Sequence, residues 1–277
     1  MAAWRWNPAR LIALAEKTRY PFAAYPRVRC ATVLFCGCSL PSQFPRTTDA
    51  LVRVARDHGA GVVFDCCGKP LVDWGAQRAA LRQGQRLRRR LERLGCERLV
   101  VACPNCLAHM RTLVAGDGIA CVSAFEALAA WGVEAQGVCE AGVFFPPCPD
   151  RGTSEIENQL RAWVPSACHL ESLRGAPCCG LAGAVAARGS HAVRACGARV
   201  LERAAGRPIY TTCASCAGQF VRLGATQPVR HGLSVVLGVD EIPDSAHAFW
   251  NRARRVFDRD LAPCRGSSFE GETPCSR

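Results

Sequence analysis

Two short stretches, Cys66-Cys67-Gly68 and Cys178-Cys179-Gly180, decide how this chain is organised. A cysteine that closes a hydrophobic run precedes each of them, and a Cys-x-x-Cys pair follows each. The first set is therefore Cys38, Cys66, Cys67, Cys103 and Cys106, and the second is Cys148, Cys178, Cys179, Cys213 and Cys216. In both sets 65 positions separate the leading cysteine from the Cys-x-x-Cys pair, while 27 and 29 residues precede the adjacent cysteines. Matching frames of this length indicate an internal duplication.

The segments between the cysteines predict alternating strands and helices. Val-rich runs typical of buried parallel strands occupy residues 62–64 and 99–102 in the first half, and residues 143–145 and 209–211 are the strands expected in the second. Helical stretches are expected over residues 48–57, 74–94, 154–164 and 182–205. The strand before Cys178 is undefined, because residues 167–173 have mixed polarity. The pattern predicts an α/β protein with two tandem cysteine-rich repeats and mostly parallel sheets.

Four segments follow from this organisation. We expect an N-terminal extension over residues 1–27, a first repeat over 28–135, a second repeat over 136–242, and a C-terminal helix with a disordered tail over 243–277. The extension is rich in aromatic residues, which favours a role in covering the first repeat or in a partner interface. The tail is rich in Gly, Ser, Pro and Glu, a composition typical of disorder.

Each cysteine group comes directly after a predicted strand. Ligands of open α/β sheets bind at the carboxyl ends of the strands. The sequence therefore predicts two clusters of five thiols, each at one edge of its sheet.

Five thiols at one site favour a metal centre with more than one metal atom. Structural zinc takes four ligands, often from two Cys-x-x-Cys pairs, and each half has only one such pair. Adjacent cysteines are difficult to place on one tetrahedral ion, whereas they suit different atoms of an iron–sulfur cluster, which cysteine thiolates hold. The spacing alone does not establish iron, and zinc and a vicinal disulfide remain alternatives.

The residues around the cysteines resemble a known family. The twice-repeated arrangement is similar to the CCG domain found in the cysteine-rich subunit of heterodisulfide reductase and in the iron–sulfur subunit of anaerobic glycerol-3-phosphate dehydrogenase. The matching stretches are Gly37-Cys38-Ser-Leu-Pro-Ser-Gln-Phe-Pro45, Cys103-Pro-Asn-Cys106, Pro147-Cys148-Pro-Asp-Arg151, Cys213-Ala-Ser-Cys216 and Val229-Arg-His231. The resemblance covers roughly residues 30–240.

This resemblance implies a function and a cofactor. In that family five cysteines of a complete motif can hold a non-cubane four-iron cluster, and two such clusters cleave a mixed disulfide. Both sets are complete here, which implies two [4Fe-4S] clusters in an oxidoreductase subunit, with electron transfer and thiol–disulfide reduction as its reaction. Two features depart from the family. The gaps between the leading cysteine and the adjacent pair are shorter in both halves, and Leu181-Ala-Gly-Ala184 replaces a glycine-rich run after the second adjacent pair.

The sequence also indicates what the chain needs from partners. It has neither a ferredoxin-type cysteine run nor a G-x-G-x-x-G fingerprint, so another redox subunit, a flavoprotein or a ferredoxin-like protein, must supply or accept electrons. A small thiol or disulfide is the expected substrate. The basic stretch 82–93 lacks interleaved aromatic residues, which argues against nucleic-acid binding.

Composition places the chain in a broad class. Its 277 residues are 49% apolar, enough for sizeable cores without covalent cross-links, and it carries 19 cysteines and a net charge of +12. Neither a transmembrane segment nor a secretory signal is recognised, because the apolar run 11–15 is short and an acidic residue follows it. A reducing cytoplasm is the expected setting, with the cysteines as metal ligands or redox groups rather than disulfides.

Nine cysteines lie outside the repeated frame: Cys30, Cys36, Cys96, Cys121, Cys139, Cys168, Cys196, Cys264 and Cys275. Cys36 is an alternative first ligand or points to the opposite strand face. Small buried hydrophobic roles are expected for Cys96, Cys121, Cys139 and Cys196, and a structural role for Cys168. His109 and His231 are candidates for hydrogen bonding to sulfur or for proton delivery.

Overall fold

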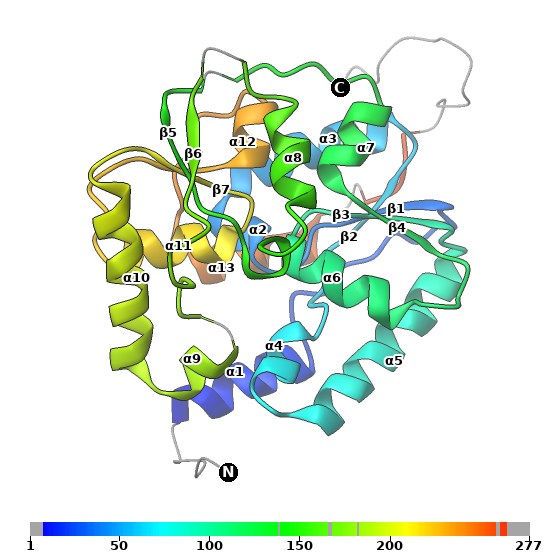
Figure 1. Ribbon diagram of the computed structural model, residues 1–277. Helices are drawn as coiled ribbons and strands as arrows, with labels where there is room; N and C mark the ends of the chain where they lie inside the picture. The colour runs from blue at the N-terminus through cyan, green and yellow to red at the C-terminus, as the bar shows by residue number, and fades with distance from the viewer. Residues whose placement is uncertain (1–7, 138, 166–167, 182, 259–260, 265–277) are drawn as a thin grey trace.

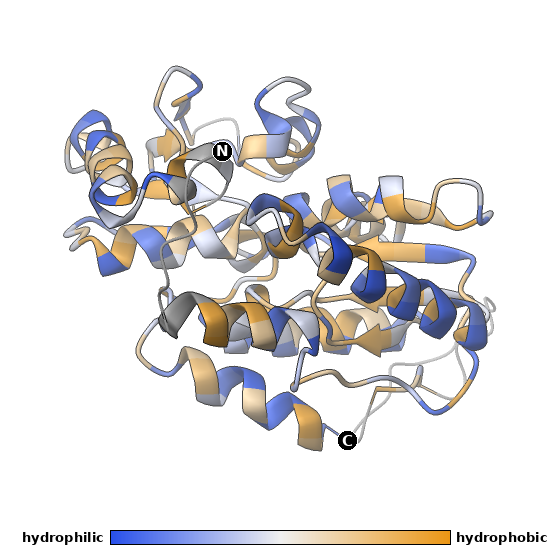
Figure 2. Cartoon of the chain, turned by 90° about the horizontal axis from the view of Figure 1, so that it is seen from below, coloured by the Kyte–Doolittle hydropathy of each residue, from blue (hydrophilic) through white to orange (hydrophobic). Residues whose placement is uncertain are grey.

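Two parallel sheets, covered by helices, form the body of the protein (Figure 1). The computed structural model describes residues 8–137, 139–165, 168–181, 183–258 and 261–264. Trp4, Trp6, Cys275 and most of the expected disordered tail lie outside these residues. Figure 2 shows helices that carry hydrophobic and hydrophilic residues together, as expected for helices that cover a sheet.

The first sheet contains β1 (Thr32–Phe35), β2 (Gly61–Val63), β3 (Arg98–Val101) and β4 (Ala120–Ser123) in the order β2-β1-β3-β4. All three strand pairs are parallel. Its helices are α2 (Leu40–Gln43), α3 (Pro45–Asp57), α4 (Lys69–Asp73), α5 (Gln77–Leu94), α6 (Pro104–Leu113) and α7 (Ala124–Ala130). The helix expected over residues 74–94 begins at Gln77, because the preceding Gly75 has a left-handed backbone.

The second sheet repeats this order. It contains β5 (Gly142–Phe144), β6 (Leu170–Ser172), β7 (Ile209–Thr211) and β8 (Val229–His231) in the order β6-β5-β7-β8, again with parallel pairs only. Its helices are η1 (Cys148–Asp150), α8 (Glu155–Arg161), α9 (Gly183–Ala187), α10 (Ser190–Ala204), α11 (Ala214–Arg222) and α12 (Gly232–Val236). The α/β class, the parallel sheets and the duplication are thus confirmed.

Some elements differ from the sequence-based expectation. The helix expected over residues 182–205 is divided into α9 and α10 at Gly189, where φ is +96°. The undefined strand before Cys178 is β6, in which only Leu170 is buried. The fourth strands β4 and β8 were not anticipated, because both are short and mix polar with apolar residues.

The two repeats share one hydrophobic core. Helices α2 and α11 pack against each other across the repeats, so closely that a Cβ at Gly218 would overlap the Gln43 side chain. The buried Glu241 carboxylate accepts the backbone N–H groups of Arg46 and Thr47 at 2.8 and 2.7 Å. A carboxylate at the N-terminus of α3 is favourable, because the first amides of a helix lack partners within it.

The terminal segments lie next to the first repeat. Helix α1 (Pro8–Thr18) packs against α4 and α5, and α13 (Ala248–Ala253) packs against α2 before a short turn, η2 (Arg254–Phe257). Residue Ala24 pairs with Phe64 in an isolated antiparallel bridge just after β2. Both termini therefore contact the first half of the chain, close to its cysteines.

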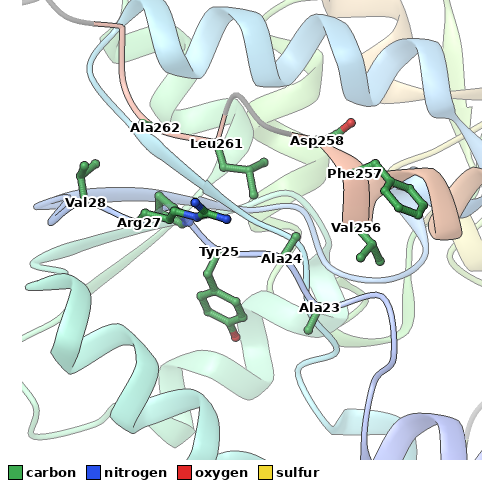
Figure 3. A pocket seen from close by; sticks show the side chains of 11 residues that line it. Ala23, Ala24, Tyr25, Arg27, Val28, Val256, Phe257, Asp258, Leu261 and Ala262 are labelled. Carbon is green, nitrogen blue, oxygen red and sulfur yellow. The ribbon is translucent and has the colours of Figure 1, made fainter.

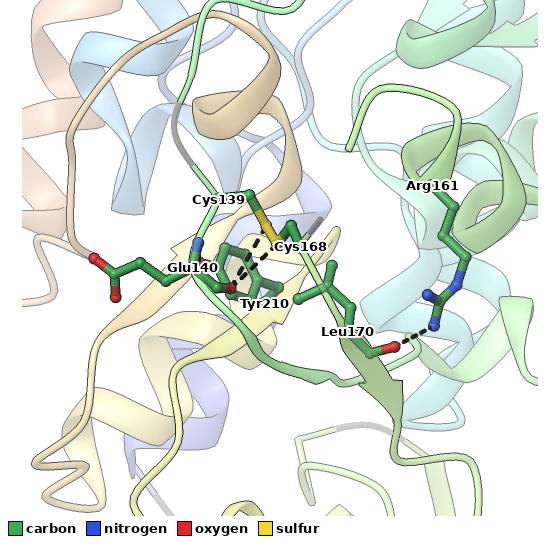
Figure 4. The surroundings of a disulfide bond; sticks show 6 residues. All are labelled: Cys139, Glu140, Arg161, Cys168, Leu170 and Tyr210. Atoms are coloured by element: carbon green, nitrogen blue, oxygen red, sulfur yellow. Dashed lines mark hydrogen bonds between the residues drawn. A yellow bond between two sulfur atoms is a disulfide. The ribbon is translucent and has the colours of Figure 1, made fainter. Parts of the chain in front are cut away.

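A disulfide joins Cys139 to Cys168 (Figure 4). The expectation that Cys139 is a small buried hydrophobic residue was wrong, and this pair is an exception to the expectation that the cysteines serve as metal ligands or redox groups. Cys139 precedes β5 and Cys168 precedes β6, so the bond lies at the amino ends of these two strands. The repeated cysteines follow the carboxyl ends, at the opposite edge of the sheet. Among the described residues, no helix has both the length and the apolar character needed to cross a bilayer.

We expect the Cys139–Cys168 bond to stabilise the fold under oxidising conditions. With a sequence separation of 29 residues, the chain-entropy model assigns it about 3–4 kcal/mol. Cys139→Ser should lower the free energy of unfolding by this order, measured by urea denaturation without reductant. The difference should disappear with a phosphine reductant, and Cys121→Ser is the matched single-cysteine control. An unchanged midpoint for Cys139→Ser without reductant would contradict the expectation.

Candidate metal centre

The topology brings the repeated cysteines to one edge of each sheet. Cys38 follows β1, the Cys66-Cys67 pair follows β2, and Cys103 ends the turn after β3. Strands β1, β2 and β3 are neighbours in the sheet, so their carboxyl ends lie side by side. The second repeat places its five cysteines in the same way after β5, β6 and β7.

The glycine after each adjacent pair has the same left-handed backbone. Gly68 has φ +89° and Gly180 has φ +91°. A Cβ at Gly180 would also lie 2.7 Å from the backbone oxygen of Val193 in α10. Only glycine adopts this conformation readily, so the third residue of the motif makes the turn that follows the two thiols.

In the first repeat the adjacent thiols turn to different partners. Cys66 is hydrogen-bonded to Cys38, whereas Cys67 is hydrogen-bonded to Cys106. Cys106 in turn contacts Cys103, at the N-terminus of α6. The five sulfur atoms therefore divide into a pair and a group of three.

The second repeat shows the same division. Cys178 is hydrogen-bonded to Cys148, and Cys179 contacts Cys216 with an Sγ–Sγ distance of 3.2 Å. Cys216 is hydrogen-bonded to Cys213, at the N-terminus of α11. The duplication is therefore preserved in the contacts of individual sulfur atoms as well as in the fold.

The two sets meet where the repeats face each other. Cys103 is hydrogen-bonded to Cys213, which joins the two groups of three. Around this contact, Asn105 Nδ2 lies 3.6 Å from Cys213 Sγ, and the hydroxyl groups of Ser39 and Ser215 lie 2.7 Å apart. We call the ten cysteines together the thiol array; its members are Cys38, Cys66, Cys67, Cys103, Cys106, Cys148, Cys178, Cys179, Cys213 and Cys216.

The thiols of this array contact one another in two pairs and in one chain of six that the Cys103–Cys213 contact completes. In the described part of the chain, no group of three or more Cys, His, Asp or Glu side chains is arranged so that it could hold a metal ion as it stands. All ten cysteines are free of disulfide bonds. Binding of a metal centre here therefore requires the thiol side chains to exchange their contacts with each other for contacts with the metal.

The two halves of the array differ in exposure. Cys66, Cys67, Cys103 and Cys106 are buried and Cys38 is half-buried. In the second half Cys148 is exposed and Cys178 is half-buried. Solvent therefore reaches the second set more easily than the first.

Hydrogen bonds between thiols give each set a thiolate. The bond from Cys66 lowers the pKa of Cys38 to about 5, although burial opposes this change. The bond from Cys148 lowers the pKa of Cys178 to about 6, assisted by the guanidinium of Arg151. A lowered pKa favours the thiolate, which is the form that binds metals.

A buried carboxylate supports the first set. Asp65, directly before Cys66, is 1% exposed and accepts the Cys66 backbone N–H at 2.7 Å. It also accepts hydrogen bonds from Tyr25, Arg90 and Gln83. The sequence did not reveal this network, because its members lie far apart in the chain. The duplication gave no signal either, since the position that Asp65 occupies in the first repeat is Pro177 in the second.

The remaining cysteine candidates occupy distinct places. Cys36 is fully buried in the hydrophobic core, where burial raises the pKa of its thiol to about 12. Cys38 is the residue that contacts Cys66. Cys196 on α10, expected as a buried hydrophobic residue, is half-buried and is hydrogen-bonded to Cys178.

The two histidines contact backbone groups. His231 Nδ1 accepts the Leu233 N–H at 3.2 Å, and burial lowers the pKa of its imidazole to about 4. Its ring is therefore neutral and caps α12. Burial also lowers the pKa of His109, which is hydrogen-bonded to the backbone of Cys67. Their proposed roles in sulfur binding or proton delivery stay predictions.

Figure 3 shows a pocket that the two terminal segments line. Its lining comes from the segment 23–28 and from the C-terminal residues 256–258 and 261–262. None of these lining residues is a cysteine. The chemistry of the repeated cysteines therefore does not belong to this pocket.

Comparison with known proteins agrees with the duplicated fold and the cysteine frame. The family model of the CCG cysteine-rich domain matches the chain twice, over residues 32–111 and 143–221. The chain therefore belongs to the CCG cysteine-rich domain family. Membership indicates a function in metal or iron–sulfur binding. A search of curated proteins gave no match.

The left-handed glycines provide a test of the site's construction. Gly180→Ala adds a methyl group against the Val193 backbone at a positive φ, and should lower the free energy of unfolding by about 2 kcal/mol or more. Gly206→Ala is the matched control, since φ is +76° there and no atom lies within 4 Å of the added Cβ. Urea denaturation should show a smaller loss for the control. Equal losses in the two variants would mean that the close approach of α10 does not matter.

Proposed function

We propose that the chain is an iron–sulfur redox subunit similar to the cysteine-rich subunit of heterodisulfide reductase. The observation that carries this proposal is that the two cysteines of each adjacent pair contact different sulfur partners. This holds for Cys66 and Cys67 in the first repeat and for Cys178 and Cys179 in the second. One tetrahedral ion would need these sulfurs to converge, whereas a cluster with several irons uses them separately.

The donor set fits such a cluster. Each half of the array offers five thiols, and thiolates are the ligands that iron–sulfur clusters take. Cys38, Cys66, Cys67, Cys103 and Cys106 would hold one [4Fe-4S] cluster of non-cubane type, and Cys148, Cys178, Cys179, Cys213 and Cys216 the other. When bound, such clusters supply electron transfer.

Neighbouring residues support a charged sulfur-rich centre. Arg151 lies near the thiols of Cys178 and Cys179, and its Nε atom is buried without a partner among the described residues. Positive charge next to thiolates stabilises their ionised form. The contact between Cys103 and Cys213 also supports an electron path between the two sets.

The proposed reaction requires partners. Reduction of a disulfide consumes two electrons and two protons and gives two thiols, so a flavoprotein or ferredoxin-like subunit has to donate the electrons. We propose a small thiol or disulfide as the substrate and the cytoplasm as the setting. The absence of a membrane-spanning helix among the described residues is compatible with this arrangement.

Metal analysis tests the proposal directly. Anaerobically purified protein should contain about eight iron atoms and matching sulfide per chain, since two four-iron clusters are expected. Stoichiometric zinc without iron or sulfide would contradict it and would favour a zinc-stabilised assembly module on the same cysteines.

Single substitutions test the ligand sets. Cys67→Ala and Cys179→Ala should each remove about half of the iron, because each thiol belongs to one cluster. Cys96→Ala and Cys121→Ala, outside both sets, are the controls and should keep the full iron content. The Cys38→Ala variant should lose iron and the Cys36→Ala variant should not, because Cys38 is the proposed first ligand. Full iron in both Cys67→Ala and Cys179→Ala would show that the assignment is wrong.

A further inference from the structure

The two terminal segments meet over the first half of the thiol array. Tyr20 and Phe22 form one apolar cluster with Cys66, against which Cys38 and Ala253 also pack. The aromatic rings continue this contact to α13, since Phe22 and Phe249 stack edge to face with centroids 5.3 Å apart. These segments lie outside both matched family ranges.

Ion pairs link the two termini at the same place. Glu16 on α1 pairs with Lys17 at 2.8 Å and with Arg252 on α13. The Arg252 guanidinium lies 5.0 Å from the Phe22 ring, a favourable contact between a cation and an aromatic face. The N-terminal and C-terminal segments therefore form one connected layer.

Lys17 is a cation of this layer that lies beside an aromatic ring in contact with the first thiol set. Its side chain is 14% exposed and its ammonium lies 5.3 Å from the Tyr20 ring centroid. Tyr20 itself belongs to the apolar cluster that contains Cys66 and against which Cys38 packs, so the ammonium lies in the layer that contacts the first set. The chain has only two lysines, Lys17 and Lys69, among its 35 basic residues.

The second half of the array has a different surrounding. Cys148 is exposed, and the cation that acts on its neighbours Cys178 and Cys179 belongs to the repeat itself, namely Arg151. The corresponding leading cysteine of the first half, Cys38, packs against the terminal layer. The terminal layer therefore covers the first thiol set, whereas among the described residues the second set has no equivalent cover over Cys148.

We propose that the terminal segments form a cap that closes the first thiol set and carries the Lys17 ammonium in the layer over Cys38 and Cys66, which leaves the second set, with exposed Cys148, as the one that a thiol substrate or redox partner reaches. The cap itself follows from contacts within the chain; the division of labour between two clusters rests on the proposed function. Lys17 is then a positioning residue that supplies charge to the first set.

Amine labelling tests the cap whether or not metal is bound. In the full-length protein, N-hydroxysuccinimidyl acetate should acetylate Lys69, which is 31% exposed, several-fold faster than Lys17, as measured by peptide mass spectrometry. Phe22→Ala should raise the rate at Lys17 several-fold and leave Lys69 unchanged. Equal rates in the wild type, or an unchanged Lys17 rate in both Phe22→Ala and Tyr20→Ala, would overturn the cap.

Redox titration tests the charge. In a Cys179→Ala background, which should retain only the first cluster, Lys17→Met should move its reduction potential to a more negative value, because a positive charge favours the added electron. Lys17→Arg, which keeps the positive charge, should leave the potential close to that of the Cys179→Ala parent. An unmoved potential in Lys17→Met overturns the role of the ammonium. If the wild-type protein contains no iron, the proposed function and the different roles of the two clusters are both overturned. The amine-labelling experiment alone then decides whether the cap exists.

Discussion

The parallel pairing of three consecutive strands is the constraint on which the site depends. Because β1 lies between β2 and β3, and β5 between β6 and β7, the turns after these strands meet at one edge of each sheet. Each turn carries its cysteines within seven residues of the strand's end, so five thiols gather at one edge of the sheet without any long loop. The left-handed glycines Gly68 and Gly180 then allow the chain to continue after two consecutive thiols.

Packing of the repeats turns two sites into one array. The close approach of α2 and α11 at Gly218, and the Glu241 carboxylate at the N-terminus of α3, hold the halves face to face. This arrangement brings Cys103 and Cys213 into contact. The two repeats share their fold and their sulfur contacts, but the surroundings of the two thiol sets differ. The first set lies under Tyr20 and Phe22, whereas in the second set Cys148 is exposed.

The sequence predicted the α/β class, the duplication and the principal strands, because these depend on local apolar runs and on spacing along the chain. It did not predict β4 and β8, whose few residues mix polarities. Nor did it predict the contact between the two sets, the Asp65 network or the place of Lys17, since these arise from packing between distant segments. The Cys139–Cys168 pairing was missed because residue spacing does not determine disulfide connectivity. The domain boundaries and the ligand sets stay predictions.

X-ray absorption spectroscopy of the anaerobically purified protein tests the central claim most directly, namely that the divided cysteine pairs serve several metal atoms at one site. At the iron edge, we predict a first shell of sulfur and a second shell of iron, which only a polynuclear centre gives. A zinc edge with four sulfur neighbours and no metal–metal shell would contradict this claim.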